Sequence, residues 1–456
     1  MRERWYHNIK RGQWLALAAA LLGWLFDGFE MGIVPPLSRT ALVELLEPNP
    51  MPALDSSGVD PAALREARQH LDKLVGEWNG YIYAAFLVGA ACGGWLFGWI
   101  GDRIGRVRAM VFSVLTYALF TGLCGLALEP WHLALLRFIA ALGMGGEWAL
   151  GVALVMESWP ARSRVVLAGL IGAAANVGFM LAAVLVLATG ALGFQAAGGG
   201  WRWLLAVCAF PALLTFFIRV FVPESERWQE AVQTGPRPGL VDIFTPELRW
   251  RTLVGALLAG VALLGTWGSV QWVPPWVSKM AGPQMASLAQ ICSGLGAVAG
   301  SFCGALLGDR LTRRLAYFLL SLGSLLSCAI LFRYPCHFED FRIVGDDSFW
   351  TWLGTVDWRF MGMVFAVGFL TASFYGWLPL YLPELFPTRV RATGQGFAFN
   401  SGRIVAAGGA LSMGYLMKYA FEGDYGYAGA TISLIYVAGL LVIWLAPETK
   451  GKPLPE

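Results

Sequence analysis

The feature that most constrains this chain is a series of apolar blocks about 20 residues long, since about 20 apolar residues in a helix cross a bilayer. Hydrophobic residues make up 57% of the 456 residues and charged residues only 14%. A soluble protein of this length does not need so much apolar surface. We therefore expect an all-α membrane protein. Twelve spans are predicted near residues 13–36, 78–100, 108–128, 131–155, 164–189, 202–221, 252–277, 286–308, 314–333, 358–382, 392–417 and 426–446.

Two charged segments recur along the chain. GDRIGRVR at 101–108 returns as GDRLTRRL at 308–315, and ESWPARSR at 157–164 returns as ELFPTRVR at 384–391. Repeats at matching positions predict two six-helix halves, as in many secondary transporters, whose substrate binds near the midplane between the halves. The predicted domains are an N-terminal half over 1–221, a cytoplasmic linker over 222–250 and a C-terminal half over 251–456.

The connecting segments differ in charge according to the side of the membrane. Most Lys and Arg residues fall in one set of segments, whereas the opposite set is richer in Asp and Glu, especially in 44–77 and 339–357. The positive-inside rule therefore places both termini in the cytoplasm of a multi-pass protein of the plasma (inner) membrane. The outer loop 38–77 is unusually long, and its 60–76 portion is predicted to be helical without an assigned role.

Several classes of function are disfavoured. The net charge of +3, without a Lys/Arg tract, does not indicate nucleic-acid binding, and the four scattered His residues have no metal-ligand spacing. No nucleophile–base pair or nucleotide loop indicates an enzyme, and no cofactor is implied. A transporter-like sensor is disfavoured because no appended soluble domain is visible. The expected partners are a small solute, the proton and the lipid bilayer, and a monomer suffices for this architecture.

The loop motifs resemble those of the major facilitator superfamily. The resemblance includes GWIGDRIGRVR at 98–108, Arg137 with the glycine run in 143–146, PESERW at 223–228 and PETKGK at 447–452. It implies the twelve-helix fold and transport by alternating access.

Three further stretches resemble the proton-coupled organic-anion branches, those of the sialate and aromatic-acid symporters: FDGFE at 26–30, GMGGEW at 143–148 and NSGR at 400–403. PESERW, ELFPTR and PETKGK are shared with the sugar porters. Glu30 stands where these anion symporters usually have Asp. Thr312 stands where the second loop motif usually has Gly, which makes the second loop contact looser.

Buried acids are the candidates for proton coupling. At 1.5 Å per residue, Asp27 in the first span and Arg137 in the fourth both lie about 10 Å from the outer face. An Asp that gains and loses an Arg partner would bind and release a proton with conformation. Glu30 follows on the same helical face, and Glu147 lies deeper in the fourth span. The alternatives are a static ion pair for Asp27 and Arg137, and a structural role for Glu147.

Arg403 is the main candidate for substrate binding because it lies near the midplane, where its guanidinium would match a carboxylate. The repeat relates it to Asn176, 227 residues earlier. The alternative is that Arg403 pairs with an acid of its own chain. The other cavity candidates are Asn400, Gln271, Trp267 and Tyr375, and for the aromatic ones simple packing is the competing interpretation.

A third set of charges is predicted to gate the two halves. Asp102 and Asp309 follow a glycine at helix ends beside arginines that face the other half, so such clusters would join the halves in one state and separate in another. The alternative is a solvated basic loop. The gating candidates are Asp102, Arg103, Arg106, Asp309, Arg310, Glu157, Arg164, Glu384 and Arg391.

The predicted function is proton-coupled symport of a small organic anion, a carboxylate. A sugar or polyol porter is the alternative that the shared loop motifs support, and an exporter of metabolites or drugs is a third. The sequence distinguishes neither the particular anion nor the proton stoichiometry.

Overall fold

The computed structural model describes residues 9–47, 61–191, 199–207, 221–234, 239–334, 356–421 and 424–456, with Tyr6 and the short stretches 209–210 and 217–218. The regular structure in these ranges is helical. The α-helices are α1 (Arg11–Leu46), α2 (Pro61–Ile104), α3 (Arg106–Leu123), α4 (Pro130–Ser158), α5 (Arg164–Ala191), α6 (Gly200–Val207), α8 (Glu226–Thr234), α9 (Arg249–Gly268), α10 (Val273–Arg310), α11 (Arg313–Arg333), α13 (Trp358–Ala372), α14 (Phe374–Tyr381), α15 (Arg391–Tyr415), α16 (Tyr425–Ser433) and α17 (Ile435–Val442). Short 3₁₀ turns join several of them, and Leu416–Ala420 forms a π-helical turn after α15.

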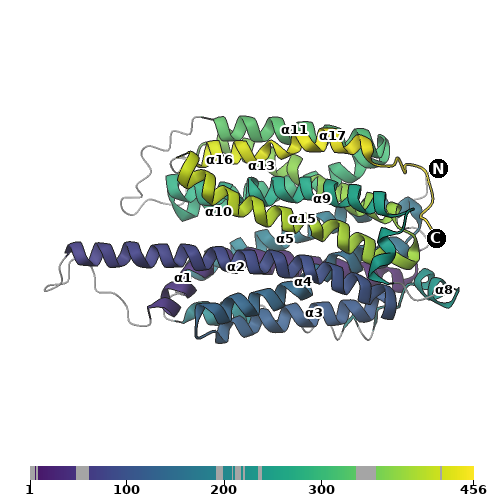
Figure 1. Ribbon diagram of the computed structural model, residues 1–456, viewed down its shortest axis with the longest axis horizontal. Helices are drawn as coiled ribbons and strands as arrows, with labels where there is room; N and C mark the ends of the chain where they lie inside the picture. The colour runs from purple at the N-terminus through teal and green to yellow at the C-terminus, as the bar shows by residue number, and fades with distance from the viewer. Residues whose placement is uncertain are drawn as a thin grey trace.

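The long helices lie side by side in a bundle. Helices α1 to α4, with α5 packed against α1, form one group, and the helices from α9 to α17 form another beside it (Figure 1). The two groups meet where α2 packs against α15 and α5 against α10. This arrangement is compatible with a boundary in the predicted linker 222–250, which is not a simple loop because it contains α8 and a 3₁₀ turn at Leu240–Phe244.

Ten helical segments in the described residues are long and apolar enough to cross a membrane. They include ten of the twelve predicted spans. The predicted span 202–221 is described only in pieces, of which α6 is the longest, so it is not among these ten segments. The span 392–417 is occupied by α15, whose polar residues Gln395, Asn400 and Arg403 lower its hydropathy but are buried inside the bundle. The count of twelve remains a prediction.

Some helix boundaries differ from the predicted spans. The predicted helix at 60–76 is present, but it is continuous with the membrane span in α2, which begins at Pro61. The span predicted to end at 277 breaks after Gly268, and α10 starts at Val273 with Pro274 in its first turn, where proline is tolerated. Hydropathy alone does not show such a break, because the residues on both sides are apolar.

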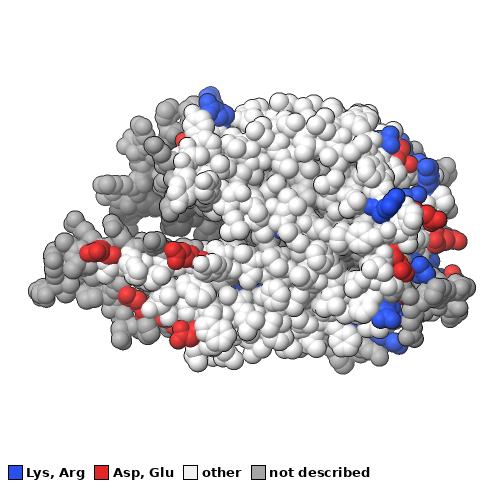
Figure 2. All heavy atoms as spheres, in the orientation of Figure 1, with Lys and Arg blue, Asp and Glu red and all other residues white. Residues whose placement is uncertain are grey.

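The bundle has a charged end, which we call the terminal end because α1 begins there and residues 447–456 lie there. Lys and Arg gather at this end, mixed with some acids, whereas the other end shows mainly Asp and Glu on the face in Figure 2. Between the ends the surface is white, which indicates uncharged side chains over the membrane-spanning part.

Two glutamates cap helices at the terminal end in the same way. Glu224 accepts hydrogen bonds from the backbone N–H groups of Arg106 and Val107 at the start of α3, at 3.0 and 3.1 Å. Glu448 accepts from those of Arg313 and Arg314 at the start of α11, at 3.0 and 3.2 Å. Burial raises the pKa of Glu224. Burial also opposes ionisation of Glu448, but these backbone donors outweigh it and lower its pKa.

Candidate functional site

A cavity of about 100 Å³ lies among helices of both groups. Its described lining comes from α1, α5, α9, α10, α13, α14 and α15, so segments far apart in the sequence share one space. The lining residues that carry polar or aromatic side chains are Trp24, Asn176, Phe179, Thr266, Trp267, Gln271, Gln290, Ser293, Thr371, Tyr375, Phe399 and Arg403. A cavity of this kind, apolar with a few convergent polar groups, is typical of a small-molecule site.

Five of the six predicted substrate-binding residues line this cavity: Arg403, Asn176, Gln271, Trp267 and Tyr375. The sixth, Asn400, lies one turn from Arg403 on α15 and holds it in place. Its side-chain oxygen accepts a hydrogen bond from Arg403 Nη1 at 2.7 Å, and its amide nitrogen donates to the carbonyl oxygen of Gly145 on α4 at 3.1 Å. Asn400 therefore links the arginine to the other group of helices.

Arg403 is 4% exposed and carries a charge with no carboxylate oxygen within 4.0 Å in the described part of the chain. Its hydrogen bond to Asn400 uses one of five N–H donors. The acid that interacts with it electrostatically is Asp27 on α1. The alternative that Arg403 is locked in a close ion pair is therefore not what the described residues show.

Asp27 and Glu147 form a pair of buried acids behind the cavity. Asp27 is fully buried and Glu147 is 1% exposed, and none of their carboxyl oxygens has a hydrogen-bond partner in the described residues. They interact electrostatically with each other. Glu147 lies against Gly23 on α1, where a Cβ atom would come within 1.9 Å of Glu147 Oε1. Gly23 therefore provides the space in which this carboxyl group lies, one turn from Asp27.

The prediction that Arg137 pairs with Asp27 is wrong. Arg137 makes a buried ion pair with Glu30 instead, and Thr121 Oγ1 donates to the same Glu30 oxygen at 2.5 Å. The guanidinium also lies over the ring of Phe86, 4.6 Å from its centroid. Depth does not distinguish two acids that lie within one helical turn, since their rotation about the helix axis decides which one meets α4.

At the terminal end, four of the predicted gating residues form one buried cluster across the two groups of helices. Arg106 pairs with Asp102 at 2.7 Å and with Glu157 at 3.0 Å, and Glu157 also pairs with Arg391 at the start of α15, at 3.1 Å. All four side chains are fully buried in this arrangement. Asp102 accepts hydrogen bonds from the backbone N–H and hydroxyl of Thr393 at 2.7 and 2.6 Å.

The repeat-related cluster is arranged differently. Glu384 pairs with Arg313 at 2.7 Å, and both belong to the later group of helices, so this pair does not cross to the other group. Asp309 and Arg310 are exposed, as is Arg103, whose guanidinium lies over the ring of Trp99. These three residues lie outside the buried clusters.

Arg164 occupies the position related by the repeat to Arg391. It is partly buried, and its Nε has no hydrogen-bond partner in the described residues. It interacts electrostatically with Glu384 without a close ion pair. The clusters therefore differ between the two copies of the repeat.

Sequence reasoning missed several residues of these sites. Arg313 is related to Arg106 by the 207-residue repeat and could have been found from it, but the predicted gating residues include Arg310 and not Arg313. Gln290, Ser293 and Thr371 gave no signal, because single polar residues are common in membrane spans. Trp24 and Phe399 also lie in the cavity wall, and Trp148 stacks on Phe399 with ring centroids 3.9 Å apart.

Comparison with known proteins agrees with this architecture. The family model for sugar (and other) transporters matches residues 54–235 and 240–456. An inner membrane metabolite transport protein of Escherichia coli, YgcS, is 31% identical over 82% of this chain and 84% of its own. A cis,cis-muconate transport protein of Acinetobacter baylyi is 28% identical over 87% of this chain and 93% of its own.

A solved structure shares the fold. The proton:xylose symporter XylE, bound to 6-bromo-6-deoxy-D-glucose, superposes with a TM-score of 0.73 at 18% identity, covering 97% of both chains. Together with the apolar helices and the paired loop motifs, these matches identify a transporter and not an enzyme. The chain belongs to the sugar (and other) transporter family within the major facilitator superfamily.

Proposed function

We propose that this transporter carries a small organic carboxylate together with protons. The observation that supports it most strongly is Arg403, a buried guanidinium on the cavity whose hydrogen bond in the described residues goes to a neutral amide. A buried cation without a close counter-ion is costly, and a bound carboxylate offsets that cost with a bidentate contact. A neutral sugar offers no such compensation. The muconate named for one relative also offers carboxylate groups, two in each molecule.

Coupling to protons follows from the acids beside this arginine. Asp27 interacts with both Arg403 and Glu147. When a substrate carboxylate binds Arg403, Asp27 loses part of its favourable interaction while its repulsion from Glu147 persists. Two adjacent buried carboxyl groups without donors repel each other if both are ionised, and a proton removes this repulsion. Anion and proton therefore stabilise one another in the site, and neither is favoured alone.

The buried cluster at the terminal end supplies the gate of an alternating-access cycle. It joins α2, α3 and α4 to the start of α15, and this contact supports the proposal that the cavity is closed toward that end in this state. Opening requires Glu157 to separate from Arg391 and Asp102 from Thr393. In the proposed orientation the terminal end faces the cytoplasm, as the distribution of basic residues predicts. The protein is proposed to have two six-helix halves that rock about the cavity, in the inner membrane and as a monomer.

Uptake by proteoliposomes tests this function. With labelled benzoate as the probe, an acidic exterior is expected to accelerate uptake, because the proton enters with the anion. Arg403→Ala removes binding, and Asp27→Asn retains binding but loses the response to the proton gradient. The matched control is Arg333→Ala, which removes an exposed arginine that lies over Tyr427.

Two outcomes contradict the proposal. One is uptake of carboxylates that does not depend on the imposed gradient in the wild type. The other is Arg403→Ala transporting carboxylates as well as the Arg333→Ala control. Competition by sugars and polyols, with none by carboxylates, would favour the sugar-porter alternative instead.

A further inference from the structure

The described wall of the central cavity contains one charged side chain. Among its 22 described lining residues, Arg403 is the cation and no lining residue is an acid. Asp27, the acid that interacts with Arg403, is buried behind the wall. An anion bound at Arg403 therefore meets one positive charge, and any second negative charge on the same ligand meets only neutral groups.

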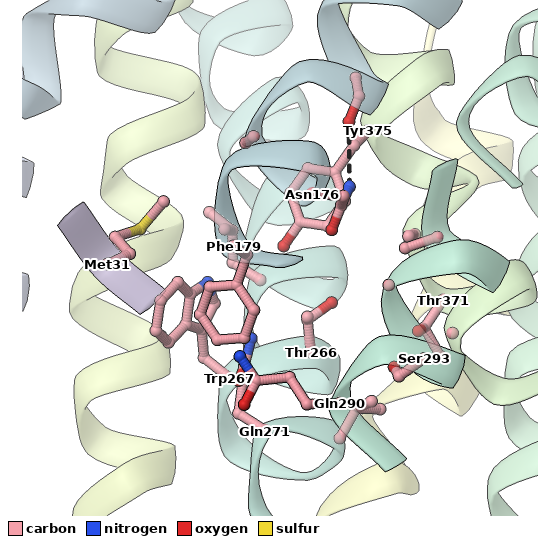
Figure 3. A pocket seen from close by; sticks show the side chains of 18 of the residues that line it. Met31, Asn176, Phe179, Thr266, Trp267, Gln271, Gln290, Ser293, Thr371 and Tyr375 are labelled. Atoms are coloured by element: carbon pink, nitrogen blue, oxygen red, sulfur yellow. Dashed lines mark hydrogen bonds between the residues drawn. The ribbon is translucent and has the colours of Figure 1, made fainter. Parts of the chain in front are cut away.

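A set of neutral polar side chains lines the cavity away from Arg403. Gln271, Gln290 and Ser293 make no hydrogen bond within the described residues, and each is only partly buried. Their amide and hydroxyl groups are therefore available to a ligand. Figure 3 shows Gln271 and Gln290 next to each other near Trp267, whereas Asn176 and Tyr375 lie together in another part of the cavity.

The two polar regions lie at different levels along the bundle. Gly402 on α15 packs against Gly260 on α9, which fixes the level of Arg403 on its neighbour. Gln271 lies about three helical turns farther along that segment, away from the terminal end. Tyr375 lies between the two regions, since it interacts electrostatically with Arg403 and through its hydroxyl with Thr266 and Trp267 on α9. The aromatic side chains of Phe179 and Trp267 line the same cavity.

We propose that the cavity selects monocarboxylates with an uncharged polar group at the opposite end, and that Gln271, Gln290 and Ser293 determine this preference. This inference rests on the proposed function. The carboxylate binds Arg403, and the far hydroxyl, ester or amide exchanges hydrogen bonds with the two glutamines. Amides donate and accept, so they satisfy either kind of neutral group. A second carboxylate at that end loses its hydration without gaining a cation, and it binds more weakly.

A matched set of ligands tests the preference. Terephthalate and its monomethyl ester share one ring and one carboxylate and differ in the charge at the far end, and 4-hydroxybenzoate supplies a small neutral donor there. In thermal-shift titrations of the purified wild-type protein at neutral pH, the ester and 4-hydroxybenzoate are expected to bind at least about tenfold more tightly than terephthalate.

We call Gln271, Gln290 and Ser293 the far wall of the cavity, and substitutions at one of its positions extend the test. Gln290→Lys adds a cation and is expected to reverse the order in favour of terephthalate. Gln290→Leu removes the hydrogen bonds without adding charge, so it weakens the binding of 4-hydroxybenzoate but not that of unsubstituted benzoate. The wild-type comparison remains decisive if a variant does not fold.

The failures of the two proposals are distinguishable. Terephthalate binding as tightly as its monoester overturns the selectivity and leaves carboxylate transport standing. If a folded Gln290→Lys protein still binds the monomethyl ester more tightly than terephthalate, the role of the far wall is also overturned. If none of the acids binds the wild type, both proposals fail, and if Arg403→Met binds them unchanged, the proposed function fails.

Discussion

Glu157 connects the two groups of helices at the terminal end, so we expect Glu157→Gln to open that end. Its two carboxylate oxygens receive hydrogen bonds from Arg106 at 3.0 and 3.3 Å, from Arg391 at 3.1 Å and from the hydroxyl of Ser225 at 2.6 Å. Both arginines are fully buried. An amide accepts through one atom only and turns an N–H group toward these donors, so at least one arginine loses its anionic partner.

The expected size of the effect follows from which contacts cross between the groups. Breaking a buried ion pair by removing one partner costs about 3–5 kcal/mol. In the variant, Arg106 still pairs with Asp102, 2.7 Å away in the same group of helices, so its charge stays compensated in both states. Arg391 is expected to be hydrated when the end is open. Its charge is therefore uncompensated only in the closed state. We assign about 3 kcal/mol to the closed state alone, which changes the ratio of closed to open molecules by about 100-fold.

Thiol accessibility measures this ratio. A cysteine at Ser293, on the cavity wall, is placed in a background without the seven native cysteines, and a membrane-impermeant reagent is added from the terminal side. Glu157→Gln is expected to label much faster. The matched control is Glu384→Gln at the repeat-related position, which breaks the pair with Arg313 inside one group of helices and should not change labelling. Equal effects of the two variants, or no effect of Glu157→Gln, would refute the reasoning.

Other expectations concern stability and are measured by thermal unfolding of the purified protein. Gly145→Ala places a Cβ 1.9 Å from a backbone carbonyl of α2 and should destabilise by about 1–3 kcal/mol or more, whereas Gly80→Ala, with nothing within 4 Å, should not destabilise. Glu448→Gln should lower the free energy of unfolding by about 1 kcal/mol at neutral pH. The pKa of Glu448 is lowered in the folded protein, so its carboxylate stabilises the fold only where it is ionised. The difference from the wild type should therefore vanish as the pH falls below 4.5. Arg137→Gln should cost about 3–5 kcal/mol by leaving Glu30 buried alone, and adding Glu30→Gln should restore part of the loss; no recovery would contradict a simple ion pair.

The helical spans were predictable because hydropathy over about 20 residues is a local property of the chain. The position of Arg403 on the cavity was also predictable, because the rise per residue gives its depth in the membrane and a charged residue is rare in an apolar span. The partner of Arg137 was not, because depth leaves the rotation of α1 undetermined and Asp27 and Glu30 lie within one turn. The neutral far wall was not predictable either, because Gln290 and Ser293 line the cavity only as a result of how α10 packs against α5 and α13.

The repeat itself shows where sequence reasoning ends. Glu157 and Glu384 occupy the same position in repeated segments, and both meet an arginine from the preceding loop motif, yet Glu157 additionally meets Arg391 across the groups. Arg164, the counterpart of Arg391, makes no such close pair within the described residues. If the two clusters were equivalent, the ion pair lost by one cluster when the end opens would be replaced by a pair in the other cluster. The closed and open states would then have the same number of such pairs. In the proposed cycle, their difference gives the closed state an ion pair that the second cluster does not replace. The bound ligands must then favour the open state by enough free energy to separate Glu157 from Arg391. A proton and a carboxylate that stabilise each other at Asp27 and Arg403 are a source of that free energy, and neither ligand alone would be expected to open the gate.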